Sequence, residues 1–200
     1  MSITFPLTFP SLDDIDTCVW MPQDIVGVSQ SPFTGIARVF DWGNQLWMFK
    51  CTLAAMNNVS AAVYQGFFRQ LRGPYGTFYF ADPTRRSPHG TISGSPLVNG
   101  GSQSGLSLIV DGAGAAQTVK AGDYFSLANN LYMSTTDATA DGSGNITLDI
   151  WPELRGTPSD NAALTFTNPL GVFMVLQDPE FDMEEVIFSG AEFTICEVPQ

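Results

Sequence analysis

The chain has 200 residues, of which 44% are hydrophobic, so it is long enough to bury a core without disulfides or metal ions. Its formal net charge is −12 and its eight Lys and Arg residues are scattered, which argues against sequence-specific nucleic-acid binding and against an anionic membrane surface, because both need clustered basic side chains. No apolar run reaches the length of about 18 residues that a membrane span needs. Residues 1–14 have no basic segment and are interrupted by Pro6 and Pro10, so no signal peptide is expected.

The three cysteines predict thiols rather than a structural staple. Cys18, Cys51 and Cys196 are an odd number and have no CxxC spacing, so neither a disulfide framework nor a zinc site is indicated. We therefore expect three reduced, mostly buried thiols. A disulfide between one pair stays open as an alternative, because the approach of the two Cα atoms that it requires cannot be derived from sequence.

The first zone of the chain, residues 1–83, predicts strands around one helix. Residues 36–40 (IARVF) and 45–53 (QLWMFKCTL) are apolar and aromatic, and residues 41–44 (DWGN) between them are typical of a turn. We expect a β-hairpin with its turn at 41–44. Residues 75–80 (YGTFYF) predict a further aromatic strand.

The only helix that the sequence supports follows residues 57–60 (NNVS), which offer N-cap side chains. Val63, Phe67 and Leu71 recur at helical spacing, and Gly73 followed by proline ends the pattern. We therefore expect a helix at about residues 59–72.

The second zone opens with residues 84–105, which are rich in Gly, Ser and Pro and predict a loop. Short strands follow from residue 106 to Trp151, with turn residues at regular spacing, which favours a small barrel or sandwich. Four apolar residues lie where a pleated surface would bury one face: Tyr124, Leu127, Leu131 and Tyr132. Ile146, Leu148 and Ile150 alternate with Thr147 and Asp149 at the strand period of two.

The third zone supplies further strands, at residues 171–176 and from 185 through 198. We expect them to return to the first zone. The predicted fold is therefore mainly β with one helix. A β-barrel or sandwich ring domain comprises residues 1–83 plus 169–200, with the helix at about 59–72, and a small β-barrel or sandwich module, residues 84–168, is inserted into it.

Several local patterns resemble functional motifs but lack the residues that the chemistry needs. Residues 111–116 (DGAGAA) lack the lysine and the helix of a phosphate loop. Residues 137–142 (DATADG) resemble half of a calcium loop, but Leu148 stands where the bidentate glutamate belongs. His89 is the only histidine, and no GxSxG motif is present. We therefore predict no catalytic, cofactor-binding or metal-binding residue, no cofactor, and a protein that is not an enzyme.

Two features suggest contacts with other proteins. Residues 178–197 contain seven carboxylates and no Lys or Arg; this stretch is either a solvated acidic loop and strand edge or a docking face for a basic neighbour. The tryptophans are either core residues or interface anchors. The candidate interface residues are Asp178, Glu180, Asp182, Glu184, Glu185, Trp42, Trp47 and Trp151.

Short motifs across residues 35–197 resemble a known family. They are residues 46–50 (LWMFK), 67–73 (FFRQLRG), 76–83 (GTFYFADP), 121–125 (AGDYF), 151–155 (WPELR) and 168–173 (NPLGVF). This chain resembles the minor tail proteins of long-tailed bacteriophages, of the distal-tail or tail-tip ring type. The motifs mark architecture, so no active site transfers with them.

The resemblance implies a structural virion protein that forms a homo-oligomeric ring at the distal tail, tail tip or baseplate. Such a ring joins the tail tube to the hub and fibres, so the implied partners are the tube, hub, tape-measure and fibre proteins. The implied location is the tail of the virion, after synthesis in the host cytoplasm. Two alternatives stay open: a carbohydrate-binding or host-adhesion module that contacts a host-surface glycan, and a connector or terminator at the head end of the tail.

Overall fold

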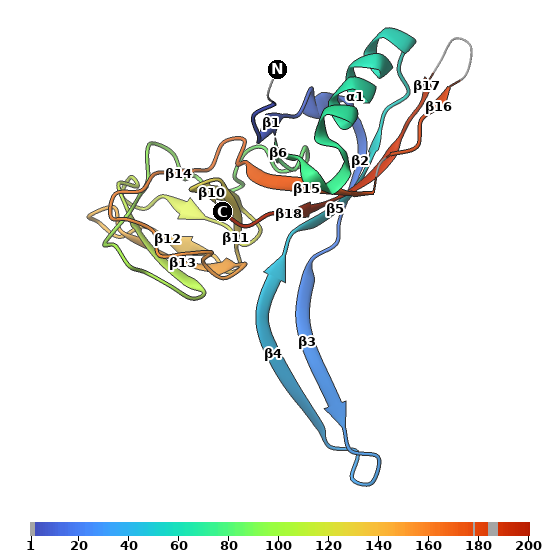
Figure 1. The fold of residues 1–200 in the computed structure, drawn as a ribbon. Coiled ribbons are helices and arrows are strands. Elements are labelled where there is room, and N and C mark those ends of the chain that lie inside the picture. Colours follow the sequence, from blue (N-terminus) through green and yellow to red (C-terminus); the bar gives the residue numbers. More distant parts are fainter. Residues whose placement is uncertain (1–2, 178, 184–187) are drawn as a thin grey trace.

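The computed structural model describes residues 3–177, 179–183 and 188–200. The fold is mainly β, with 42% of the residues in strands and a single α-helix among the described residues, as the sequence predicts. Two six-stranded sheets form its body, and a long β-hairpin projects away from them (Figure 1). Within the described ranges, no helix is long and apolar enough to cross a membrane.

The first sheet curls into a nearly closed barrel and combines strands from both ends of the chain. Its strands, in spatial order, are β1 (Leu7–Thr8), β6 (Thr77–Phe80), β15 (Gly171–Gln177), β18 (Glu192–Glu197), β5 (Met48–Leu53) and β2 (Ile15–Trp20). The β1–β6 pair is parallel and the other pairs are antiparallel. Residues near 80 and near 171 are therefore neighbours in space.

The interior of the first sheet is aromatic because alternate residues of its strands point inward. In β5, the side chains of Phe49, Cys51 and Leu53 are buried, and the residues that alternate with them are half-buried. This is the period of two that a pleated strand imposes. Phe80 and Phe173 pack against Phe49 with ring centroids 5.9 and 5.7 Å apart. These edge-on and tilted ring contacts are the geometry that aromatic quadrupoles favour.

Helix α1 (Asn58–Leu71) packs on this core between two short 3-10 helices, η1 (Leu12–Asp14) and η2 (Gly73–Tyr75). The Asn57 side chain accepts a hydrogen bond of 2.9 Å from the Ser60 N–H, which confirms the predicted N-cap. The helix lies where the spacing of Val63, Phe67 and Leu71 predicts it. Val63 is exposed, and the face that packs on the core comprises Ala61, Tyr64, Phe67, Phe68 and Leu71.

The second sheet lies beside the first. Its strands, in spatial order, are β14 (Leu164–Thr165), β10 (Tyr124–Leu127), β11 (Asn130–Ser134), β13 (Ile146–Trp151), β8 (Ser107–Asp111) and β7 (Leu97–Val98). The predicted alternation is confirmed in β13, where Ile146, Leu148 and Ile150 are buried and the residues between them are exposed. All strands of this sheet come from residues 97–165. The boundaries of the inserted module, at 83/84 and 168/169, stay a prediction.

Three smaller strand pairs complete the fold. They are β9 (Thr118–Val119) with β12 (Ala138–Thr139), β16 (Asp182–Met183) with β17 (Phe188–Ser189), and β3 (Gln23–Gln30) with β4 (Ala37–Leu46). The β3–β4 pair is the projecting hairpin of Figure 1, and we name residues 23–46 the arm.

The arm corrects the predicted hairpin. Its turn is at residues 31–36, where Gly35 has a φ of +68°, and residues 41–44 lie inside strand β4. They form a bulge, because the register jumps from the pair Val26–Asp41 to the pair Asp24–Gln45. Gly43 supplies the positive φ of +66° that this bulge requires. The turn-like composition of 41–44 therefore encodes an irregularity within a strand.

Candidate functional site

The arm is a surface that the rest of the described chain leaves almost entirely uncovered. Every residue from 37 to 44 is exposed, and so are all residues of β3 except Gly27. The exposed side chains include large apolar ones: Ile25, Val26, Val28, Phe33, Ile36, Val39, Phe40 and Trp42. Contiguous exposed apolar surface of this kind marks protein–protein contacts in soluble proteins. The arm is therefore the principal candidate for a functional surface.

Both faces of the arm are apolar. Val28 lies directly opposite Val39, and these two side chains are 66% and 65% exposed on one face. On the other face Gly27 lies opposite Phe40, and the indole of Trp42 lies over Gly27, where a β-carbon would come within 3.1 Å of Trp42 Nε1. A partner can therefore contact apolar side chains on both faces of the arm.

The base of the arm is anchored to the second sheet by residues 151–155, which comprise the last residue of β13 and the segment that follows it. The Trp151 indole N–H donates to Asp24 Oδ1 over 3.2 Å, and the Glu153 main-chain N–H donates to Gln45 Oε1 over 2.9 Å. The Arg155 guanidinium also donates to the Gln45 carbonyl oxygen. These bonds tie residues 151–155 to both strands of the arm at its root.

A tryptophan cluster fills the seam between the two sheets. The ring centroids of Trp47 and Trp151 are 4.8 Å apart, and Trp20 lies 5.6 Å from Trp47 and 5.7 Å from Trp151. Trp47 is fully buried, and its indole N–H donates to the Leu131 carbonyl over 2.7 Å. The cluster thus joins β2, the junction of β4 and β5, β11 and the end of β13.

A buried ion pair lies in the same seam. The Arg155 guanidinium is 2.5 Å from Glu197 Oε2, and the two side chains are 9% and 1% exposed. The main-chain N–H of Trp47 donates to the same oxygen over 3.4 Å. Among the described residues, neither Arg155 Nε nor Glu197 Oε1 finds a hydrogen-bond partner. Burial raises the pKa of Glu197, while the charge and hydrogen bond of Arg155 act in the opposite direction.

The pKa of Glu197 makes stability depend on pH. Because the folded state binds this proton more tightly than the unfolded state, Glu197 contributes stability below its ordinary pKa of 4.5, and that contribution is lost as pH rises through the raised value. We expect the free energy of unfolding of the wild type, minus that of Glu197→Gln, to fall as pH rises from 4.5. Urea unfolding at a series of pH values measures this difference; a difference that is constant or grows with pH would contradict the assignment.

The structure separates the predicted interface residues. Trp42 is 72% exposed on the arm. Trp47, which lies between β4 and β5, has no exposed surface and packs in the seam against Phe49 and Trp151. Trp151 is half-buried beside it. Glu180 is exposed, Asp182 begins β16, and the predicted residues Asp178, Glu184 and Glu185 lie outside the described residues.

The acidic stretch at residues 178–197 is not a uniform surface. Glu192 forms an exposed ion pair of 2.8 Å with Lys50 on the neighbouring strand β5. Glu197 is buried with Arg155, as described above. Among the carboxylates of this stretch that the structure describes, Glu192 and Glu197 therefore meet cations of the same chain, because the fold brings distant basic residues to them.

The motif-like residues of the second zone have structural partners. The carboxylate of Asp123 is buried and accepts hydrogen bonds from the main-chain N–H groups of His89, Gly90 and Lys120, at 2.6, 3.0 and 2.8 Å. His89 Nδ1 lies 3.2 Å from Asp123 Oδ1. The buried carboxylate thus fixes the loop that carries His89 to the second sheet.

The calcium-like loop is likewise held by its own side chains. Asp141 Oδ1 accepts from the N–H groups of Ser143 and Asn145, at 2.8 and 2.9 Å, and these bonds lower its pKa. Asp137 pairs with Lys120 at 2.7 Å. In the part of the chain that the structure describes, His, Cys, Asp and Glu side chains nowhere gather in a group of three that could hold a metal ion.

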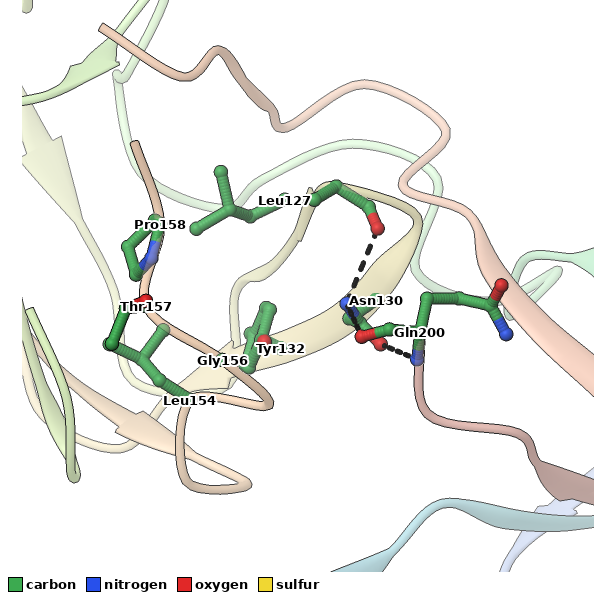
Figure 2. A pocket seen from close by; sticks show the side chains of 9 residues that line it. Leu127, Asn130, Tyr132, Leu154, Gly156, Thr157, Pro158 and Gln200 are labelled. Carbon is green, nitrogen blue, oxygen red and sulfur yellow. Dashed lines mark hydrogen bonds between the residues drawn. The ribbon is translucent and has the colours of Figure 1, made fainter. Parts of the chain in front are cut away.

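A small pocket of about 190 Å³ opens beside Tyr132 at the edge of the second sheet (Figure 2). Asn130 and Gln200 close one side of it, where the Gln200 N–H donates to Asn130 Oδ1 over 2.8 Å. Leu127, Leu154 and residues 156–158 line the remainder. No charged side chain lines this pocket, so it offers less to a partner than the arm does.

Strand β3 of the arm was not among the strands predicted from the sequence. Residues 23–30 (QDIVGVSQ) alternate Val26 and Val28 with Gly27 and Ser29, which is the strand period of two. That alternation, followed by Ser-Pro and Gly35, is a hairpin signal. Exposure of its apolar side chains could not be derived from the pattern, because the same alternation describes a half-buried strand.

The chain matches no protein-family model. A search of curated proteins likewise finds no significant relative.

Proposed function

We propose that this protein is a structural subunit of a bacteriophage tail, which assembles into a ring at the distal tail or tail tip through its arm. Its role is architectural rather than enzymatic: the ring joins the tail tube to the hub and fibres. The observation that carries the proposal is the arm, with exposed apolar side chains on both faces and an anchored root. The tail-protein motifs of the sequence give this surface its context.

The physical argument begins with the instability of a bare arm. A two-stranded hairpin is marginally stable in water, because it has no third strand or opposing layer to bury its side chains. Here the arm holds Val28, Val39 and Phe40 more than half exposed. Burying apolar surface contributes about 25 cal/mol per Å². Association therefore stabilises the arm and the complex together.

The low charge of the arm permits a second copy as the partner. The chain has a net charge of −12, and two copies repel each other wherever acidic surfaces meet. The arm contains only Asp24, Arg38 and Asp41 as charged residues, and Asp24 already accepts a hydrogen bond from Trp151. Contact through the arm thus brings copies together where repulsion is least.

The shape of the subunit favours a ring over a symmetric pair. An arm that projects from one side docks on a different surface of its neighbour, which is a head-to-tail contact. Repetition of such a contact closes into a ring when the rotation between subunits permits. A tail-tip ring needs this type of interface.

Self-association tests the proposal. Val28→Thr/Val39→Thr replaces two exposed methyl groups with hydroxyls and retains β-branching, so the strands persist. We expect the wild type to self-associate. The double variant should raise the dissociation constant by about tenfold or more, which corresponds to a loss of about 1.4 kcal/mol of association free energy. Sedimentation velocity over a concentration series measures this.

The matched control places the same change on the helix. Val59 and Val63 of α1 are 80% and 56% exposed, and Val59→Thr/Val63→Thr should leave association unchanged. A wild type that stays monomeric at all concentrations, or a control as disruptive as the arm variant, would refute assembly through the arm.

On phage particles, antibody to this protein should label the distal tail. Label at the head end would support the connector alternative, and absence of label from the particles would reject the virion role.

A further inference from the structure

The two barrel strands that connect to the arm hold two thiols in contact. Cys18 of β2 and Cys51 of β5 are direct partners in the strand register, and their sulfur atoms are 2.9 Å apart. Directly opposed residues of antiparallel strands have Cα atoms about 4.5–5.5 Å apart, which is within the range of about 4.4–6.8 Å that a disulfide spans. The backbone already has the spacing that such a bond needs.

The third cysteine has no such neighbour in register. Cys196 of β18 lies opposite Met48 on one side and Met174 on the other. All three cysteines are free thiols in this structure. The strand pairing therefore singles out one pair of the three that the sequence allows.

We propose that Cys18 and Cys51 are a redox modification site, at which a low-molecular-weight disulfide such as oxidised glutathione oxidises the two thiols to an intramolecular bond between the barrel strands that lead into and out of the arm. The inference is independent of the proposed tail function, because it depends only on the geometry of β2 and β5.

The two cysteines have different parts in the reaction. Cys18 is half-buried and Cys51 has no exposed surface. The hydrogen bond with Cys18, together with burial, raises the pKa of the Cys51 thiol, so Cys51 stays protonated in the reduced protein. Because the thiolate is the attacking species and must reach the reagent, Cys18 takes the first step.

The exchange balances in two steps. The Cys18 thiolate attacks one sulfur of oxidised glutathione, the S–S bond of the reagent breaks, and one glutathione leaves as a thiolate that takes up a proton. Cys51 then attacks Cys18 Sγ, the mixed disulfide breaks, and the second glutathione leaves with the proton from Cys51. The two protein thiols lose two electrons, and one oxidised glutathione becomes two reduced molecules.

The position of the bond gives it a consequence. Strand β2 leads directly into β3, and β4 leads into β5, so the bond closes the segment between two residues 33 positions apart, which contains the whole arm. A covalent link at the root limits local separation of β2 from β5. Oxidation should therefore fix the arm on the barrel without touching its exposed side chains.

The test uses the full-length reduced protein incubated with oxidised glutathione, then denatured and alkylated. We expect the alkylated thiols to fall from three to one, a non-reduced digest to yield a peptide pair linked through Cys18 and Cys51, and a phosphine reductant to restore all three. Cys196→Ser should form the same bond. Cys18→Ser should form no intramolecular bond, and Cys18 tolerates this change better than buried Cys51.

Several results would overturn the inference. They are three thiols that persist after oxidation, a bond that uses Cys196, or a bond that forms only between two copies. Hydrogen exchange at residues 23–46 tests the consequence separately, because it should slow on oxidation in the wild type and not in Cys18→Ser. An unchanged exchange rate in an oxidised wild type would refute the stapling of the arm.

Discussion

Trp47→Ala should destabilise the protein by about 3–5 kcal/mol, the cost of removing a fully buried aromatic side chain. Trp47 is the largest side chain without exposed surface, and it packs against Phe49, Tyr124 and Trp151. Its removal leaves a cavity in the seam between the two sheets and strips the Leu131 carbonyl of its donor. Urea unfolding followed by far-UV circular dichroism measures the loss.

Two other variants calibrate this result. Trp47→Phe retains most of the ring but loses the N–H donor, so it should cost about 1–3 kcal/mol for the unsatisfied carbonyl together with the smaller ring. Trp42→Ala removes a side chain that is 72% exposed on the arm, and its unfolding free energy as a monomer should change by no more than about 0.5 kcal/mol. Equal losses of unfolding free energy in Trp42→Ala and Trp47→Ala would contradict the larger contribution of the seam to stability.

Arg155→Met should cost about 3–5 kcal/mol at neutral pH, because it leaves the carboxylate of Glu197 buried without its cation. The variant also removes the bond from the guanidinium to the Gln45 carbonyl. Without Arg155, the pKa of Glu197 loses an influence that lowers it. The defect should therefore shrink as the pH is lowered and Glu197 takes up a proton.

A second change separates charge from packing. Arg155→Met/Glu197→Gln removes both charges, and it should recover more than half of the stability that Arg155→Met loses, because the cost arises mainly from an unpaired buried charge. Lys50→Met breaks the exposed pair with Glu192 and should cost less than about 1 kcal/mol. Thermal and urea unfolding of the three variants test this order, and a double variant no more stable than Arg155→Met would contradict the charge argument.

The seam and the arm have different physical characters, although residues of both were candidates for one interface. Trp47 and Trp151 contact each other and hold the two sheets together. Trp42 differs from both of them because its side chain is 72% exposed on the arm. The proposed assembly surface therefore comprises the arm, while the seam supplies the rigid root from which the arm projects.

Local sequence determined those elements whose signals lie within a few residues. The Asn57 N-cap and the Gly73 stop defined the helix, and Ile146, Leu148 and Ile150 defined the buried face of β13. Capping bonds and strand alternation depend on neighbours along the chain, so they can be derived from the sequence without knowing the fold. The mainly β architecture followed from the same local signals.

Only the tertiary structure decided what those elements meet. It placed the bulge of residues 41–44 inside a strand, buried Trp47 while exposing Trp42, paired Glu197 with Arg155, and set Cys18 against Cys51. Each of these outcomes depends on strand register and on contacts between residues far apart in the chain. Burial and pairing are properties of those long-range contacts, and a residue pattern alone fixes neither of them.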